Sequence, residues 1–486
     1  MNGSVREECQ DMEECKEAMV YMWGYIPGAS PEKSPILSPV PVRLPEGGVE
    51  AWKDVCGGGC GFSMAISETG KLITWGSAND EVQSYLTSGK HGETPEPFPL
   101  PTEAAVVKAA AGWAHCVSVT ETGGVYTWGW KECVPSETFV HDLVIGGSLQ
   151  KDTTGKQNSQ LNDQCDFFYL YCNKTNASAK DQHSNMTGGT ISHVDKKQMG
   201  EEIGKRRKIS LVKQESDSYG DDFFTASPCL VNLGDGVRII TVAAGGRHTL
   251  ALSDVGQVWG WGYGGEGQLG LGIRVKTVAT PHIIKCIEQS ASGKESMSSS
   301  TEVSKVLGSC VKGIACGGRH SAVITDAGRL LTFGWGLHGQ CGQGSTDDQL
   351  RPTYVSSLSG IQVERVAAGL WHTICISAEG RAYAFGGNQF GQLGTEGDQD
   401  ESLPKLLEAL SLKSKHAKIV SCGARHSAVL TEDGQLFSWG WNKYGQLGLG
   451  DSVDRNAPFQ VSITGYRPKN VACGWWHTLL LAERPL

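Results

Sequence analysis

The sequence lacks the marks of fibrous, membrane-spanning and strongly basic chains. Only 18 of its 486 residues are proline, and no Gly-x-y period accompanies its 64 glycines, which excludes a collagen-like chain. No apolar run is long enough for a membrane span, so we expect no membrane association. Basic residues number 43 against 52 acidic ones, a net charge of -9. We therefore do not expect the folded part to bind DNA directly.

The sixteen cysteines also lack the context that would give them an oxidising or metal-binding role. The N-terminal 25 residues are acidic and contain no apolar core of the length a secretory signal needs. Cys56 and Cys60 have no second pair at zinc-finger spacing. We expect free thiols, no bound metal and no cofactor.

What the sequence has in excess is glycine, at 64 of 486 residues or about 13%, against an average near 7%. An interior glycine costs a helix about 1 kcal/mol relative to alanine, so this abundance argues against a helical bundle. It suits many short strands joined by tight turns.

Much of this glycine belongs to an internal repeat. A Gly-x-x-His motif occurs six times and ends at His115, His248, His320, His372, His426 and His477, and a degenerate first copy has Phe62 instead. From the first copy to the sixth, a turn glycine follows eight residues later. Five residues after that come aromatic-Gly pairs at Trp75, Trp128, Trp261, Phe333, Phe385 and Trp439. Two short apolar runs around a glycine turn predict a buried hairpin.

The spacing of the motif predicts the architecture. Four of its six intervals are 51 to 54 residues, and seven such units stacked around an axis can bury both faces of each hairpin. We predict an all-β, seven-bladed β-propeller over residues 17–486, preceded by an acidic tail at residues 1–16. The two longer intervals contain a polar insertion at residues 131–222, between the second and third repeats, and a Ser-rich loop at residues 287–304. We expect the long insertion to be disordered.

The seventh copy is incomplete, because the chain ends nine residues after His477. The missing aromatic-Gly strand occurs at the other end of the chain, in the Met-Val-Tyr-Met-Trp-Gly run at residues 19–24. We therefore predict that an N-terminal strand completes the last blade and closes the ring. Closure removes the exposed edges of an open sheet.

The His-led strand, the turn glycine, the aromatic-Gly pair and the Gly-Gln-Leu-Gly element at residues 267–270 together resemble the repeats of the regulator of chromosome condensation family. The resemblance covers nearly everything outside the two insertions and is greatest to plant members. It implies a seven-bladed propeller with about this repeat length. It does not fix function, because one fold supports many functions.

The family's founding member is a nucleotide exchange factor for the small GTPase Ran that docks on nucleosomes, so the resemblance implies exchange activity as one alternative. Exchange requires acidic residues and a wedge loop that open the nucleotide site. The chain is acidic overall, but no specific exchange residue can be matched, and solvated surface carboxylates explain the charge as well.

A second alternative is similarity to the plant UV-B photoreceptor, whose sensor is a tryptophan cluster from consecutive Gly-Trp-Arg-His-Thr repeats. The equivalent positions here are Gly246, Gly318, Leu370, Ala424 and Trp475, with Trp113 in the second blade. Consecutive copies therefore lack the tryptophans, which disfavours photoreception.

The interpretation we favour is a non-enzymatic, monomeric nuclear scaffold that binds chromatin, histones or a regulatory protein. Lys205, Arg206, Arg207 and Lys208 form a short basic run in the long insertion that resembles a monopartite import signal, although such runs also occur on solvated loops. The nearby Ser210 resembles a basophilic kinase site, and phosphate there would weaken the run. We expect a nuclear protein with a cytoplasmic pool.

The histidines and their neighbours have different expected roles. Six equivalent histidines around an axis lie too far apart to bind one metal ion, so we expect them to bond across strands. The residues around the motif vary, and we expect a protein-binding rim of the channel, where a loop enters the innermost strand, at Trp113, Arg247, Arg319, Trp371, Arg425, Trp475 and Trp476. The alternative is that these side chains only stack on one another across blades. No nucleophile-base pair or phosphate loop stands out, so we expect no catalytic residues.

Overall fold

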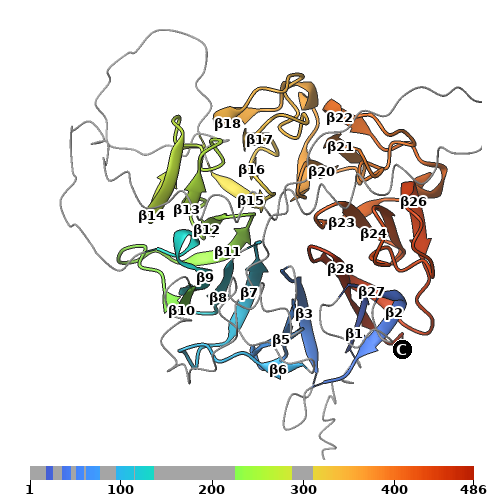
Figure 1. Cartoon of the computed structure of the whole chain (residues 1–486), viewed down its shortest axis with the longest axis horizontal. Coiled ribbons are helices and arrows are strands. Elements are labelled where there is room, and N and C mark those ends of the chain that lie inside the picture. The colour runs from blue at the N-terminus through green and yellow to red at the C-terminus, as the bar shows by residue number, and fades with distance from the viewer. Residues whose placement is uncertain are drawn as a thin grey trace, which may run out of the picture. The chain divides into compact units, whose positions relative to one another are not determined.

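The described part of the chain is built of strands arranged as seven blades (Figure 1). A computed structural model describes residues 18–25, 35–44, 51–59, 62–76, 95–113, 115–135, 225–286 and 310–485. These all belong to one compact unit of residues 1–137 and 218–486. Each blade is a four-stranded antiparallel sheet, which confirms the predicted all-β, seven-bladed propeller.

The blades follow one another along the chain. Blade 1 contains β3 (Trp52–Gly57), β4 (Phe62–Ser67), β5 (Leu72–Gly76) and β6 (Glu96–Pro97), and blade 2 contains β7 (Val106–Ala111), β8 (His115–Thr120), β9 (Val125–Trp130) and β10 (Thr225–Leu230). Blade 3 contains β11 (Ile239–Ala244), β12 (His248–Ser253), β13 (Val258–Gly264) and β14 (Val275–Ile284). Blade 4 contains β15 (Val311–Cys316), β16 (His320–Thr325), β17 (Leu330–Gly334) and β18 (Gln349–Tyr354).

The second half of the ring repeats this pattern. Blade 5 contains β19 (Val363–Ala368), β20 (His372–Ser377), β21 (Ala382–Gly386) and β22 (Glu401–Leu406), and blade 6 contains β23 (Ala417–Cys422), β24 (His426–Thr431), β25 (Leu436–Gly440) and β26 (Arg455–Val461). Blade 7 contains β27 (Arg467–Cys473), β28 (His477–Glu483), β1 (Ala18–Gly24) and β2 (Ile36–Val42). Three short 3-10 turns, η1 (Lys131–Cys133), η3 (Ser356–Leu358) and η4 (Leu410–Leu412), lie in connecting segments.

The His-led strand is the second strand of its blade, not the innermost one. The first strands of the blades, β3, β7, β11, β15, β19, β23 and β27, contact their counterparts in the neighbouring blades and so lie nearest the axis. We expected the residue before each motif histidine to lie where a loop enters the innermost strand. In the structure this residue lies where the chain leaves the innermost strand. The innermost strands are short runs of small residues, such as Val-Ala-Ala, which the apolar pattern of the repeat did not reveal.

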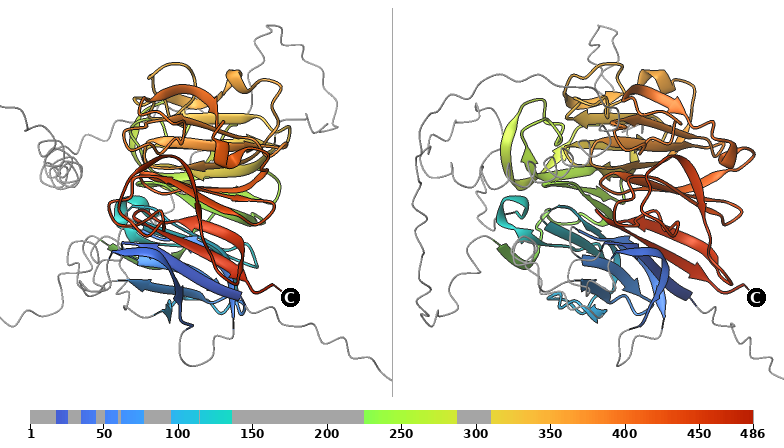
Figure 2. Two further views of the ribbon diagram at one scale, coloured as in Figure 1. Left: turned by 90° about the vertical axis from the view of Figure 1, so that its right-hand side faces the viewer. Right: turned by 45° about the vertical axis from the view of Figure 1, so that its right-hand side comes forward.

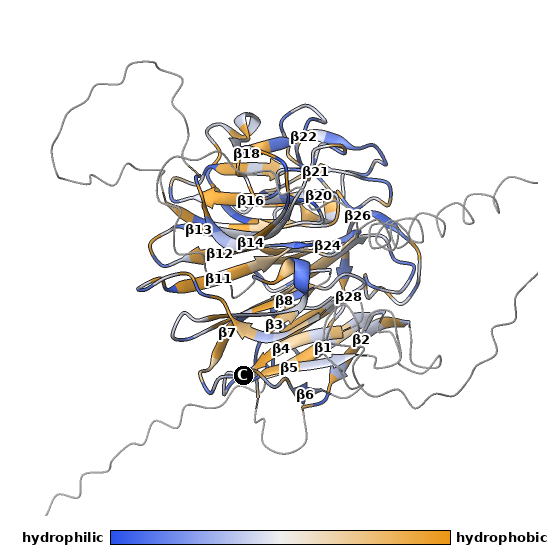
Figure 3. Cartoon of the chain, turned by 60° about the vertical axis from the view of Figure 1, so that its left-hand side comes forward, coloured by the Kyte–Doolittle hydropathy of each residue, from blue (hydrophilic) through white to orange (hydrophobic). Residues whose placement is uncertain are grey.

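The core of the propeller lies between blades. Every His-led strand is buried along its length, as in β16 and β24, except for the last residue of β28. The aromatic residue of each aromatic-Gly pair is also buried and packs on the preceding blade, as Phe333 of blade 4 does in one cluster with Leu250 and Leu252 of blade 3. Figure 3 shows strands of successive blades lying over one another, with many hydrophobic segments among them. Each blade therefore depends on its neighbours for burial.

The last blade is closed by the N-terminus, as predicted. β1 pairs antiparallel with β28, with Trp23 opposite Thr478, and the side views show the blue N-terminal strands beside the red C-terminal strands (Figure 2). The N-terminal region supplies two strands and not one, since β2 pairs with β1 at the outer edge. The Trp23 indole N–H donates to the backbone oxygen of Gln446, 2.9 Å away, which ties this blade to blade 6.

The outermost strand of every blade contains proline. The residues are Pro39 and Pro41, Pro97, Pro228, Pro281, Pro352, Pro404 and Pro458. Proline cannot donate a backbone hydrogen bond, so it weakens the edge as a template for pairing with another chain. Nearly half of the chain's few prolines thus protect the seven exposed edges.

Several predicted segments lie outside the described residues: the acidic tail at residues 1–16, the Ser-rich loop, the basic run Lys205, Arg206, Arg207 and Lys208, and Ser210. The described chain stops at residue 135 and resumes at residue 225, between β9 and β10, which are adjacent strands of blade 2. Residues 131–134 still belong to the propeller, since Cys133 and Val134 are buried. The described residues include no helix that is both long and apolar enough to cross a membrane.

Candidate functional site

The motif histidines link neighbouring blades. Each ring Nε2 lies within hydrogen-bond distance of a hydroxyl on the next blade: His115 to Thr249 (2.6 Å), His248 to Ser321 (2.9 Å), His320 to Thr373 (2.8 Å), His372 to Ser427 (2.9 Å), His426 to Thr478 (2.9 Å) and His477 to Ser63 (2.9 Å). All six side chains are buried. Each of these bonds therefore joins the second strands of two neighbouring blades.

Four of these hydroxyls fix the tautomer of the histidine. Ser321, Thr373, Ser427 and Thr478 donate to the backbone oxygens of Gln268, Gln340, Gln392 and Gln446, the glutamines of the Gly-Gln-Leu/Cys-Gly elements. A hydroxyl has one proton, so it must accept from the histidine, which therefore carries its proton on Nε2. Burial lowers the pKa of His320 and His426 to about 3, so both stay neutral. No group of three or more potential ligand side chains among the described residues could hold a metal ion.

The glycine three residues before each histidine is required by packing. A Cβ on Gly423 would lie 2.1 Å from Cε1 of His426 and 2.6 Å from the backbone oxygen of Gly474 in the next blade. Gly369 is equally enclosed by His372 and the oxygen of Gly423. The motif therefore combines an interblade hydrogen bond with a close backbone approach that only glycine allows.

On one face of the propeller, two columns of the repeat meet and form a continuous surface, which we call the rim. In blades 3 to 7, one column is the residue before the motif histidine, namely Arg247, Arg319, Trp371, Arg425 and Trp476. The other is the residue after the aromatic-Gly pair, namely Tyr263, Trp335, Gly387, Trp441 and Tyr25. In all five blades the second residue donates its backbone N–H to the oxygen of the first, at 2.7 to 2.9 Å. In blades 3, 4 and 6 the two side chains also contact one another as cation–π pairs.

Arg425 organises the rim over blades 5 to 7. Only 2% of this residue is exposed, and its guanidinium carbon lies 5.2 Å from the ring centroid of Trp371, 5.4 Å from that of Trp441 and 6.0 Å from that of Trp476. Cation–π contacts of a desolvated arginine contribute up to about 2 kcal/mol. Arg425 and the buried Trp371 therefore fit the alternative in which the rim side chains only stack on one another across blades.

The aromatic part of the rim continues to the N-terminal strand. Trp441 makes edge-to-face contacts with Trp476 (5.2 Å between centroids) and Tyr444 (5.4 Å). Tyr25 packs against Tyr444 in a tilted arrangement, with ring centroids 4.8 Å apart. The segment that closes the ring thus also completes this surface.

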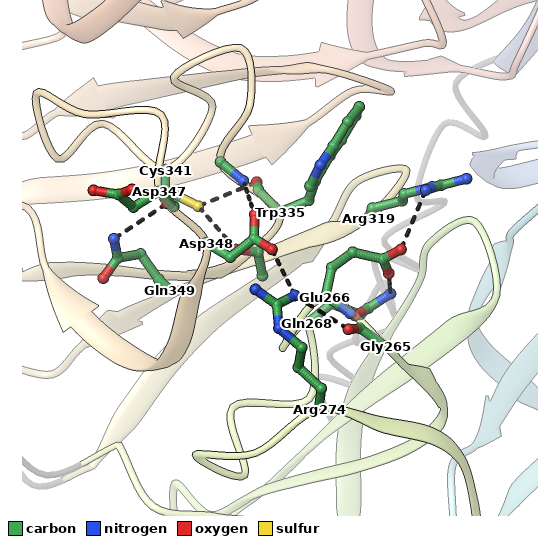
Figure 4. A network of polar contacts seen from close by, with 12 residues as sticks. Gly265, Glu266, Gln268, Arg274, Arg319, Trp335, Cys341, Asp347, Asp348 and Gln349 are labelled. Atoms are coloured by element: carbon green, nitrogen blue, oxygen red, sulfur yellow. Dashed lines mark hydrogen bonds and ion pairs between the residues drawn. The ribbon is translucent and has the colours of Figure 1, made fainter.

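Blades 3 and 4 form a more polar part of the rim. Arg247 stacks on Tyr263 at 4.2 Å, and Arg319 lies 5.4 Å from the ring of Trp335. Figure 4 shows Arg319 of blade 4 reaching back to Glu266 of blade 3, with 3.2 Å between nitrogen and oxygen. The Arg319 side chain remains 32% exposed. Arg247 and Arg319 thus remain accessible to a binding partner.

A histidine lies between these two parts of the rim. His338 stacks on Trp371 at 5.0 Å, meets Trp335 edge-on at 5.4 Å, and its Nδ1 lies 2.9 Å from a carboxylate oxygen of Asp400. Burial acts to raise the pKa of Asp400. The hydrogen bonds from His338 and from the backbone N–H of Asn388 outweigh burial and hold that pKa below its usual value.

The remaining two predicted rim residues lie together. Trp113 of blade 2 contacts Trp475 of blade 7, with ring centroids 5.9 Å apart, and both side chains are half-buried. Of the predicted rim residues, the structure thus groups Trp371, Arg425 and Trp476 in one cluster and Trp113 and Trp475 in a second. Arg247 and Arg319 form a third.

Sequence reasoning missed half of the rim. The residues not predicted are the column after each aromatic-Gly pair and the residues before the glycine of the Gly-Gln-Leu/Cys-Gly element, namely Glu266, His338, Phe390 and Tyr444. Reading the variable residues in every column of the repeat would have found these aromatic side chains.

Comparison with known proteins places the chain in a family. The RCC1-like domain matches residues 177–480. The Arabidopsis thaliana ultraviolet-B receptor UVR8 is 37% identical over 266 residues, which cover 54% of this chain and 54% of that protein. Human RCC1 domain-containing protein 1 is 33% identical over 207 residues, covering 34% of this chain and 54% of the relative. The chain spans about half the length of these two curated relatives.

Two solved structures share the fold. Human WBSCR16 superposes with a TM-score of 0.64 at 18% identity, covering 97% of this chain and 100% of that one. Prp20p from Saccharomyces cerevisiae superposes with a TM-score of 0.63 at 18% identity, covering 97% and 93%. The matched domain, the relatives and the seven blades lead to one conclusion: this chain belongs to the RCC1-like domain family.

Proposed function

We propose that this chain is a non-enzymatic, nuclear interaction scaffold that binds a protein partner through the rim. The observation that supports this most is the pair of accessible arginines, Arg247 and Arg319, each stacked on a ring and set beside half-buried tryptophans on one face. Arginine, tryptophan and tyrosine dominate the energetics of protein interfaces.

The buried cluster around Arg425 supports the proposal in a different way. Its stacking holds Trp441 and Trp476 in place before any partner arrives, so less side-chain entropy is lost on binding. Leu337, next to His338, is 56% exposed on the same face and supplies an apolar contact.

The partners we propose are histones or another regulatory protein, with exchange on a Ran-like GTPase as the alternative activity. The structure of Prp20p was described together with its binding properties to Gsp1p and histones. A pull-down from nuclear extract, probed for histones and for Ran, separates these partners. A nucleotide-release assay with Ran then tests exchange directly.

The rim is tested by replacing its accessible cations. Arg247→Ala with Arg319→Ala should weaken binding of the captured partner by about tenfold or more and leave the melting temperature nearly unchanged. Lys71→Ala with Arg381→Ala removes two exposed cations at the hairpin turns on the opposite face and serves as the matched control. Unchanged partner binding in the rim variant would contradict the proposal.

Nuclear import is proposed to use Lys205, Arg206, Arg207 and Lys208. Replacing all four with alanine should move a fluorescent fusion from the nucleus to the cytoplasm, and Ser210→Asp should shift it in the same direction. A fusion that stays nuclear without the four cations refutes the assignment.

Photoreception remains the least favoured alternative. UVR8 is a curated relative, but in this chain the tryptophans at the position preceding the arginine column are limited to Trp113 and Trp475 among the described residues. Irradiation at UV-B wavelengths, followed by size-exclusion chromatography, should leave the oligomeric state unchanged. A light-dependent change would favour the receptor function instead.

A further inference from the structure

The end of the central channel opposite the rim carries a repeated irregularity. Each innermost strand begins on the face of the hairpin turns, and each has a register shift one residue after its start or, in β27, after its second residue. The residues left unpaired are Lys53, Val107, Ile240, Lys312, Glu364, Lys418 and Lys469. A bulge bends the strand and redirects its side chains.

These seven bulges concentrate positive charge. In six of the seven blades, the bulged residue or the one after it is basic: Lys53, Lys108, Lys312, Arg365, Lys418 and Lys469, all of them exposed. Acidic residues in the same two positions are limited to Asp54 and Glu364. An innermost strand has one edge paired within its blade and both faces covered by neighbouring blades. Exposure there therefore means exposure to the channel or its mouth.

Part of this charge is neutralised by ion pairs. Lys108 lies 2.8 Å from Asp54, Lys312 lies 3.3 Å from Glu364, and Lys469 lies 2.8 Å from Glu483 at the end of β28. Within the described residues, Lys53, Arg365 and Lys418 have no such partner. With Lys469 they form an arc over four consecutive blades, 5, 6, 7 and 1.

Side chains at these positions reach from one innermost strand to the next. The Lys108–Asp54 pair joins blades 2 and 1, and the Lys312–Glu364 pair joins blades 4 and 5. The side-chain amide of Asn470 donates to the Asp54 carboxylate and so joins blades 7 and 1. The charged groups of adjacent bulges therefore lie close together around the end of the channel.

We propose that this end of the channel binds a compact, multiply phosphorylated anion, held by Arg365, Lys418, Lys469 and Lys53. Guanidinium and ammonium groups on four consecutive blades can each donate to a different phosphate group, and the planar arginine can do so with two hydrogen bonds. This site is separate from the rim and independent of the proposed function.

The charges around the site favour a compact anion over nucleic acid. Six hairpin turns on the same face carry an exposed carboxylate farther from the axis: Glu68, Glu121, Asp254, Asp326, Glu379 and Glu432. A duplex lying across this face would place phosphates next to these carboxylates, which costs energy by like-charge repulsion. A small anion at the axis stays away from these turn carboxylates.

The test is a titration of the full chain with inositol hexakisphosphate and with inorganic tripolyphosphate by isothermal calorimetry. Lys53→Gln, Arg365→Gln and Lys418→Gln together should weaken binding of both probes by about tenfold or more. The matched control, Lys71→Gln, Arg381→Gln and Lys413→Gln, removes three exposed cations outside the channel and should stay within about twofold of the unchanged protein. Circular dichroism melts check that both variants fold.

Three results would overturn the proposal. The first is no binding of either phosphate probe to the unchanged, folded protein. The second is an equal loss in the channel variant and the control, which would show general electrostatic attraction. The third is competition by duplex DNA or by a polyglutamate peptide as strong as that of inositol hexakisphosphate, which would assign the surface to another class of partner.

Discussion

Two kinds of junction between blades occur in this ring, and they differ in chemistry. Six junctions are joined by a buried histidine and a hydroxyl. At the junction between blades 1 and 2, Phe62 replaces the histidine, and Cys116 stands where the other blades have serine or threonine. Both side chains belong to one apolar cluster with Met64 and Trp128.

The difference between the two kinds of junction shows that the histidine position and the hydroxyl position on the next blade are substituted together. A histidine facing an apolar residue, or a hydroxyl facing a phenyl ring, would leave a buried polar group unsatisfied at a cost of about 1–3 kcal/mol. Replacing both partners avoids that cost. The apparent degeneracy of the first repeat is therefore a consistent apolar substitution, and not a loss of structure.

The largest effect should come from removing the closing strand, which lies next to the histidine of the blade 7 to blade 1 junction. Deleting residues 1–25 removes β1 and the buried Trp23, and the loss of one such side chain costs about 3–5 kcal/mol. We expect the melting temperature to fall by about 10 °C or more, measured by circular dichroism. Deleting only residues 1–16 is the control and should change it little.

Acid should destabilise the polar junctions next. Burial lowers the pKa of His115 and His477 to about 4 and of His248, His320, His372 and His426 to about 3. Below about pH 6.5 the unfolded chain binds protons that the folded chain cannot, so stability falls as pH falls. Each histidine contributes up to about 1.4 kcal/mol per pH unit. Urea denaturation at pH 7 and pH 5 measures this, and equal midpoints would contradict it.

Converting one polar junction to the apolar type tests the pairing itself. His115→Phe leaves the Thr249 hydroxyl facing a phenyl ring and should cost about 2–3 kcal/mol. Adding Thr249→Cys should recover a large part of that loss, since it reproduces the Phe62–Cys116 combination. Urea denaturation of the two single variants and the double variant gives the coupling energy. Simple additivity would contradict the interpretation.

The reverse conversion should have the smallest effect. Phe62→His with Cys116→Thr should change stability by about 1 kcal/mol or less relative to the unchanged protein, although Phe62→His alone should cost more. The double variant should also show the steeper acid sensitivity of a seventh buried histidine. An equal pH dependence would indicate that the new histidine is not buried like the others.

Much of the fold could be predicted because each blade repeats the same packing problem. Gly423, His426 and Trp439 recur at fixed spacing since each contacts the next or the preceding blade, so their period gave the blade count. The pairing of β1 with β28 followed from the half-repeat at each end of the sequence. These are regularities of residue type and spacing, which a single sequence displays.

The rim could be predicted only in part, because it depends on which positions of the repeat lie next to one another in the folded chain. Arg247 and Arg319 were identified from the variable position before the histidine. Tyr263 and Trp335 were missed, since their proximity arises from a backbone hydrogen bond between strands that are far apart in the repeat. The exposure of the rim arginines could not be predicted from the sequence either. Arg425 and Arg319 occupy equivalent positions in the repeat, but aromatic rings from blades 5 to 7 enclose only Arg425.

The sequence by itself determined the number of blades, the closure of the ring and the structural role of the histidines, because each follows from local spacing and residue chemistry. The tertiary structure decided which strand lies nearest the axis, which arginines remain accessible and which cations of the bulged innermost strands form ion pairs. Those properties depend on distances between residues of different blades, and such distances exist only once the ring has closed.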